Sequence, residues 1–114
     1  MFNIKKASAM RTLNHFGIPV KYKPEGAVYN EGLNVWLTDF SKSENKIEFI
    51  YLESGESPLP ELVLTTAHIA YQVPSLEEAL VGKKLLFGPA VCDEHLTIAF
   101  IEEEGIALEL MEFK

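Results

Sequence analysis

The sequence contains a single cysteine, Cys92, so no disulfide can form within the chain. A lone cysteine without a reactive setting is most often a small buried apolar residue, and it favours a reducing compartment. No stretch approaches the ~20 apolar residues that a membrane span needs, and the start, MFNIKKASAM, lacks the apolar run of a secretion signal. We therefore expect a cytoplasmic protein without a membrane partner.

Positive charge is also scarce. The chain has 10 Lys and Arg against 17 Asp and Glu, which gives a net charge of −7 at pH 7. Phosphate binding needs a clustered basic surface, so nucleic acid is not an expected partner. The sequence has no Gly-rich phosphate loop, no cysteine pair with zinc spacing and no nucleophile motif around a Ser or Cys. These absences argue against phosphate-loop chemistry and nucleophilic acyl transfer.

In its other features, the composition is that of an ordinary globular domain. The chain has 114 residues, of which 47% are hydrophobic, enough for one core but not for two independent domains. The stretch SGESPLPE, residues 54–61, is linker-like because of Pro58 and Pro60. We therefore predict a single domain, 1–114, with module one at about 1–53, a linker at 54–61 and module two at about 62–114.

Module one is predicted to begin with a helix. Ile4, Ala7, Met10 and Leu13 follow a three-to-four spacing that places them on one helical stripe between Phe2 and Phe16, with Gly17 as the stop. Strands are then expected over 17–24, 33–40 and 46–53.

Module two is predicted to begin with a strand over 64–73, where apolar residues alternate. Ser75 and Glu78 form a capping box that opens a short helix, which Gly82 ends. Three strands follow over 83–91, 95–101 and 105–113, and the first of them should break at Gly88 and Pro89.

The two modules have the same element order, except that module one lacks a clear opening strand before its helix. This is a repeat of pattern rather than of identity. Each unit alone would expose an apolar face and two sheet edges. We therefore predict an α+β fold with two βαβββ-type modules, which pair into a cupped, partly closed mixed sheet with the helices outside.

Three polar side chains lie inside apolar strands and are the candidate site. Glu48 and Glu109 each have apolar neighbours on both faces of the predicted strand, and His68 lies in the strand that opens module two. A buried carboxylate without a partner is expensive, so each needs a cation, a donor or a raised pKa. A divalent metal ion shared by His68, Glu48 and Glu109 would satisfy all three. The alternatives are that one face reaches solvent, or that Lys46 or Arg11 neutralises the acids.

Other candidates have weaker support. Trp36 lies on the mixed face of its strand, where it would line a cup and stack on a ligand or pack in the core. His95 could supply a further ligand. His15, at the end of the predicted helix, is interpreted as a partner of the helix dipole.

Two segments lie within residues 64–113, HIAYQVPSLEEAL and IAFIEEEGIALELMEF. Together they resemble the second module of the vicinal oxygen chelate superfamily, which includes glyoxalase I, bleomycin resistance proteins and extradiol dioxygenases. In that superfamily the metal is held by one residue from the first strand and one from the last strand of each module. The resemblance implies His68 and Glu109 as ligands from module two, and Glu48 from module one. The fourth ligand would come from the opening strand of module one, which is not recognisable in the sequence.

The resemblance implies a small lyase or isomerase of the glyoxalase type, which binds adjacent oxygens of a carbonyl compound on a divalent metal ion. Glu109 is then the candidate ligand and catalytic base. The alternatives are a metal-free module that binds a small molecule, as in bleomycin resistance, and a vestigial cup in a protein that acts only through partners. The missing opening strand would expose a sheet edge, so a homodimer is expected.

Overall fold

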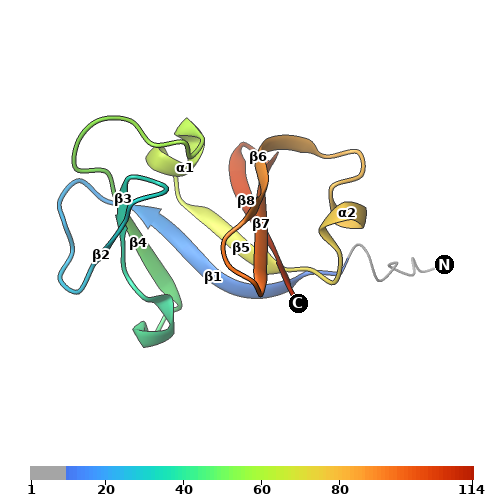
Figure 1. The fold of residues 1–114 in the computed structure, drawn as a ribbon, viewed down its shortest axis with the longest axis horizontal. Coiled ribbons are helices and arrows are strands. Elements are labelled where there is room, and N and C mark those ends of the chain that lie inside the picture. The colour runs from blue at the N-terminus through green and yellow to red at the C-terminus, as the bar shows by residue number, and fades with distance from the viewer. Residues whose placement is uncertain (1–9) are drawn as a thin grey trace.

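The computed structural model describes residues 10–114, and Figure 1 shows their arrangement. Eight strands and two short α-helices are assigned among these residues. No helix in this part of the chain is long and apolar enough to cross a membrane. In chain order, the elements are β1 (Thr12–Pro19), β2 (Val28–Asn30), β3 (Val35–Leu37), the 3-10 helix η2 (Phe40–Lys42), β4 (Ile47–Tyr51), α1 (Glu61–Thr65), β5 (His68–Gln72), α2 (Leu76–Ala79), β6 (Lys84–Val91), β7 (Leu96–Glu103) and β8 (Ile106–Phe113).

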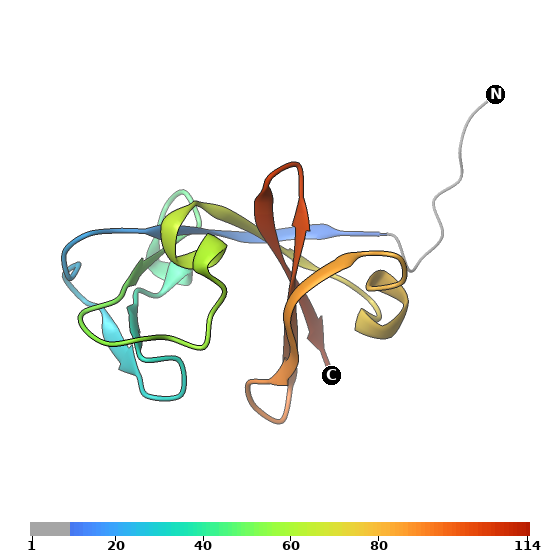
Figure 2. The same ribbon diagram turned by 90° about the horizontal axis from the view of Figure 1, so that it is seen from above.

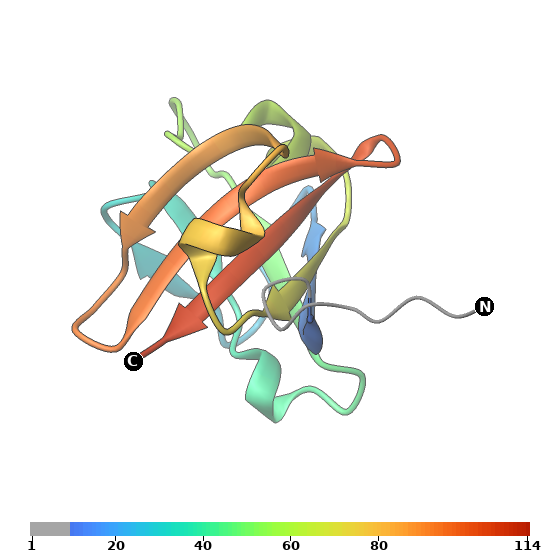
Figure 3. The same cartoon turned by 90° about the vertical axis from the view of Figure 1, so that its right-hand side faces the viewer.

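All eight strands belong to one mixed sheet with the order β2-β3-β4-β1-β5-β8-β7-β6. β1 and β5 are antiparallel neighbours at its centre, and each has a parallel neighbour on its other side, β4 beside β1 and β8 beside β5. The strand order is therefore the same in both halves when it is read outward from the centre. The β2-β3-β4 and β6-β7-β8 groups lie at opposite ends of the long central pair (Figure 2). The view along the long axis shows how strongly the sheet curls (Figure 3). The prediction of an α+β fold with a cupped mixed sheet is confirmed at this level.

The two faces of the sheet carry separate apolar clusters. On the inner face, Val35 and Ile50 from one half belong to the same cluster as Phe100 and Met111 from the other. On the outer face of the second half, α2 packs against β7 and β8. The Ser75 side chain accepts a hydrogen bond from the backbone N–H of Glu78 and begins α2 as predicted.

The prediction of a helix over Phe2–Phe16 is wrong where the structure describes it. Residues 12–19 form β1, whereas positions 1–9 of the predicted helix lie outside the described residues. The first half therefore has the opening strand that the sequence analysis did not find, and it lacks a helix between β1 and β2. Pro19, Pro24 and Gly26 explain this absence, because the connecting segment contains residues that interrupt helices. Strand pairing on both sides of β1 outweighs the weak helical spacing.

Several strand predictions also differ from the structure. The strand predicted over 17–24 ends at Pro19, and β2 begins only at Val28. The strand predicted over 64–73 begins at His68, because α1 occupies its first residues.

β6 extends over Lys84–Val91, and its pairing with β7 is irregular at the predicted break, where the register shifts between Phe87 and Ala90. The linker is not a bare spacer, because Leu59 is buried within it and α1 follows it with a fully buried Val63. Both side chains belong to the inner-face cluster. The segment between the two halves thus packs into the concave side of the sheet.

Candidate metal centre

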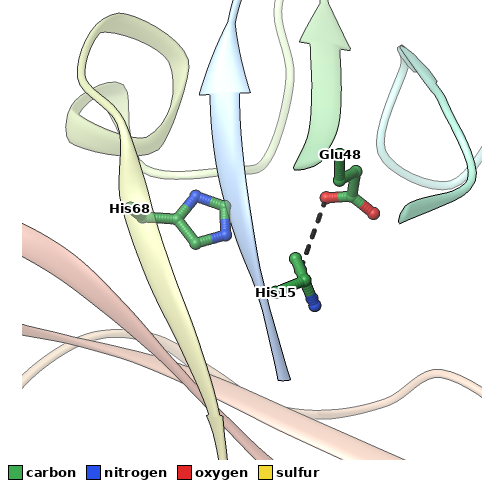
Figure 4. Close-up of side chains that lie close together, drawn as sticks. All are labelled: His15, Glu48 and His68. Carbon is green, nitrogen blue, oxygen red and sulfur yellow. Dashed lines mark ion pairs between the residues drawn. The ribbon is translucent and has the colours of Figure 1, made fainter. Parts of the chain in front are cut away.

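The site begins with Gly17, which lies at the centre of a row of three residues on adjacent strands. Gly17 in β1 is opposite Glu48 in β4 and opposite His68 in β5. A Cβ atom at Gly17 would lie 2.0 Å from Cε1 of His68 and 2.5 Å from each ring nitrogen. The imidazole therefore extends across β1 in the space that a side chain would fill (Figure 4). Glycine at this position allows the His68 ring to reach the middle of the sheet.

A second row lies beside the first. His15 in β1 is opposite Ala70 in β5, and Ala70 is opposite Glu109 in β8. Side chains two residues apart on a strand share a face, so this row lies on the same side of the sheet as the Gly17 row. The two rows have the same pattern, because a small residue separates a histidine from a glutamate in each. Four candidate ligands from four adjacent strands thus converge on the inner face.

The closest pair of polar atoms has the spacing of two ligands on one ion, and the other pairs are wider apart. Glu109 Oε1 lies 3.2 Å from His68 Nε2 and 3.5 Å from His15 Nε2, and His15 Nε2 lies 3.8 Å from Glu48 Oε1. Ligand atoms of His15, Glu48 and His68 all lie within 4.8 Å of one another. Ligands held at ~2.1 Å from one ion are about 3.0–3.4 Å apart when they are neighbours in its coordination shell. Small movements of these side chains would complete such a shell.

The hydrogen bonding of His15 favours a metal. Its Nδ1 lies 2.7 Å from Oδ1 of Asn14, an acceptor, so Nδ1 can carry a ring proton while Nε2 faces the two carboxylates. Nε2 is buried and has no hydrogen-bond partner among the described residues. Its neighbours are carboxylate oxygens, which accept rather than donate when ionised. A bound cation would accept the lone pair of Nε2 and balance the charge of the carboxylates, so the residues fit a divalent metal ion.

The buried surroundings of the site strongly change the acidity of its two carboxylates. His15 and His68 are each 2% exposed and Glu109 is 7% exposed. Burial, together with the charge of Glu109, raises the pKa of Glu48 to about 7. Burial also acts to raise the pKa of Glu109, but the imidazoles of His15 and His68 outweigh it and lower that pKa to about 2. The two carboxylates thus have very different affinities for protons in the metal-free protein.

The four residues open onto a cavity of about 220 Å³. The ring of Phe40 stacks on His15 with 4.4 Å between centroids, and the edge of Phe100 meets His68 at 5.2 Å. The remaining polar side chains of the wall are those of Asn30 and Cys92. The apolar wall consists of Leu33, Leu37, Phe40, Ile50, Leu59, Val63, Leu96, Ile98, Phe100 and Met111.

The structure brings together the three residues that the sequence analysis selected, Glu48, His68 and Glu109, and their metal binding stays a prediction. It adds His15, whose interpretation as a helix-dipole partner is wrong because residue 15 lies inside β1. A sequence signal for His15 exists. The tetrapeptides HFGI at 15–18 and HIAY at 68–71 share the order histidine, large apolar, small, large apolar.

Two other candidates lie away from the cavity. The Trp36 ring contacts Tyr29, with 5.4 Å between centroids, and Lys23 Nζ lies 3.9 Å from the Trp36 centroid. Trp36 is not among the residues that line the cavity, so the prediction that it binds the ligand there has no support from the geometry. The His95 side chain is 71% exposed beside Glu94, so it is not the additional ligand.

Comparison with known proteins gives a fold relative. No protein-family model matches the chain, and no curated protein matches it. A hypothetical protein from Bacillus halodurans, known from its crystal structure, has 23% sequence identity and a TM-score of 0.61 over 91% of this chain and 95% of that chain. At this identity the likeness shows a shared fold alone.

Proposed function

We propose that this protein binds a divalent metal ion through His15, Glu48, His68 and Glu109 and acts as a lyase or isomerase of the glyoxalase type. The observation that carries the proposal is that two histidines and two glutamates line one apolar cavity, with His15, Glu48 and His68 grouped together and Glu109 in contact with both histidines. Imidazole and carboxylate together suit the transition metals and zinc. Two small residues, at the centres of the two rows, leave the space for this arrangement.

The repeated register supports the related proposal that the two halves are modules of the vicinal oxygen chelate type. Glu48 is opposite Gly17 in one half, and Glu109 is opposite Ala70 in the other, in both cases across a parallel strand pair. Each half therefore supplies one histidine from its opening strand and one glutamate from its last strand. This is the ligand pattern that the sequence resemblance implies.

A bound divalent ion would polarise a substrate carbonyl and stabilise the negative charge that develops on its oxygen. The apolar walls of the cavity exclude water and hold the remainder of the substrate. A carboxylate at the site would then move a proton. The resemblance implies Glu109 as this base, and the pKa of Glu48 near 7 makes that carboxylate the competing candidate. Glu48 is the other carboxylate at the site, so Glu48→Gln and Glu109→Gln should be compared directly.

The direct test is metal analysis of the purified protein, followed by calorimetric titration with Zn²⁺, Mn²⁺ and Co²⁺. We expect one ion per chain, and we expect His15→Ala and His68→Ala each to reduce the affinity at least tenfold. His95→Ala is the matched control, because that imidazole is exposed and lies outside the cavity. Absence of a stoichiometric ion under every loading condition would remove the proposal.

The apolar wall gives one reason to retain a second candidate, a metal-free module that binds a small molecule in the same cavity. Ligand binding that persists in excess chelator and in Glu109→Gln would favour this candidate. Binding that requires the ion favours the enzyme.

A further inference from the structure

The walls of the metal cavity contain little that could recognise a charged group. Besides the four candidate metal ligands, the only polar side chains at the wall among the described residues are Asn30 and Cys92. The amide of Asn30 is neutral, and its Oδ1 accepts a hydrogen bond from the backbone N–H of Leu33 at 3.0 Å, so Asn30 could donate a hydrogen bond but supplies no charge. The thiol of Cys92 is uncharged in its ordinary form, and its partial burial together with the charge of Glu109 raises its pKa. Neither group would balance a negative substituent.

Positive charge is also missing from this cavity. No Lys or Arg of residues 10–114 lines it. Lys42, for example, lies in a different hollow beside Asp39, and the Arg11 guanidinium is paired with Glu103. The ligand set of two glutamates and two neutral histidines balances the charge of one divalent ion. An anionic substituent would therefore lose its hydration and gain no partner.

The size of the cavity sets a second limit. Its 220 Å³ corresponds to about seven water molecules at their volume in the liquid, or a ligand on the order of ten non-hydrogen atoms. Leu59 and Val63 contribute to this limit, because the segment between the two halves packs into the concave side and occupies space there. A nucleotide, a peptide conjugate or a long acyl chain would not fit inside.

We propose that the substrate is a small uncharged molecule with two adjacent oxygens and a compact hydrocarbon group, and that the site discriminates against anionic substituents. This inference rests on the proposed function, because the adjacent oxygens are those that the metal would bind. The hydrocarbon group lies against the apolar wall. A phosphate, a nucleotide or a peptide placed inside the cavity is then disfavoured by charge, by size or by both.

The test uses catechol derivatives as probes of the Zn²⁺-loaded protein. Protocatechuamide and protocatechuate present the same two oxygens and have nearly the same shape, but only the second carries a carboxylate. We expect isothermal titration calorimetry to show at least tenfold tighter binding of the amide. A biphenyl catechol tests size and should bind more weakly than catechol itself. Equal affinity for the amide and the carboxylate would overturn the proposed discrimination.

Two variants at one position show whether the wall causes the discrimination. Cys92 is exposed, so substitution there should leave the fold intact. Cys92→Lys places a cation at the wall and should reduce the amide-to-carboxylate affinity ratio at least threefold, whereas Cys92→Ser keeps the wall neutral and should preserve the ratio. An unchanged ratio in Cys92→Lys would contradict the electrostatic cause. Failure of the wild-type protein to bind Zn²⁺ would remove the proposed function itself, which distinguishes the two failures.

Discussion

Gly17 makes room for the proposed metal ligand His68, and its replacement by alanine gives the sharpest test of the site. The added Cβ atom would lie 2.0 Å from Cε1 of His68. An ordinary carbon contact is about 3.5 Å, so the ring would have to move by about 1.5 Å. Metal ligands tolerate displacements of only about 0.2 Å from their normal distances. Gly17→Ala should therefore remove His68 from the coordination shell without changing any ligand.

The same clash should lower the free energy of unfolding. Both residues lie inside paired strands, and His68 is 2% exposed, so neither the backbone nor the ring has free space for the movement. Overfilling a packed interior typically costs ~1–3 kcal/mol. We expect Gly17→Ala to lower the free energy of unfolding of the metal-free protein by about this amount, as measured by urea denaturation in the presence of a chelator.

Metal affinity is the second measurement on this variant. Calorimetric titration with Zn²⁺ should show at least a tenfold loss for Gly17→Ala, since disturbing the support of a ligand has effects of about 10–100-fold. Gly32→Ala is the matched control, because the nearest atom to an added Cβ there is 3.6 Å away, an ordinary contact. Wild-type affinity in Gly17→Ala would refute the placement of the His68 ring on which the proposed site depends.

Asn14→Ala removes the 2.7 Å contact that orients the His15 imidazole, and we expect titration calorimetry to show about tenfold weaker metal binding. Glu103→Gln should lower the free energy of unfolding at pH 7 by up to ~1 kcal/mol, because the partners of this carboxylate are partly exposed. Hydrogen bonds from Arg11 and Lys83 lower the pKa of Glu103 to about 2 from an ordinary 4.5. A carboxyl group whose pKa is lowered in the folded state stabilises the fold at pH values above its ordinary pKa. Urea titrations should therefore show that the difference in unfolding free energy between wild type and Glu103→Gln shrinks as the pH falls from 4.5 toward 2.

Both variants have a neighbouring control. Asn45→Ala removes an exposed amide outside the metal cavity and should leave the affinity unchanged. If Asn14→Ala binds the metal as tightly as wild type, the His15 imidazole does not depend on the Asn14 contact for its orientation. Glu104 follows Glu103 in the turn between β7 and β8. Glu104→Gln should have little effect on the free energy of unfolding at any pH. If wild type still has a higher free energy of unfolding than Glu103→Gln below pH 2, the charge of the carboxylate is not the cause of the difference.

Local sequence pattern was sufficient for most of the second half of the molecule, except that α1 occupies the first residues of the strand predicted over 64–73. Alternation over His68–Gln72 and Ile106–Phe113 predicted β5 and β8, and the capping pair of Ser75 and Glu78 predicted the start of α2. These signals are local, because strand alternation and helix caps depend on residues only a few positions apart. The same patterns selected Glu48, His68 and Glu109 as polar groups inside apolar strands.

Only the tertiary structure placed His15 in the candidate site. Residues 12–16 also fit a helical spacing, and the choice between helix and strand was made by pairing with β4 and β5, which are distant in sequence. The importance of Gly17 likewise depends on which residues lie opposite it across two strands. The sequence by itself determined which side chains are costly to bury without a partner. The pairing of the two halves determined that these side chains meet, because register between distant strands is a property of the whole sheet.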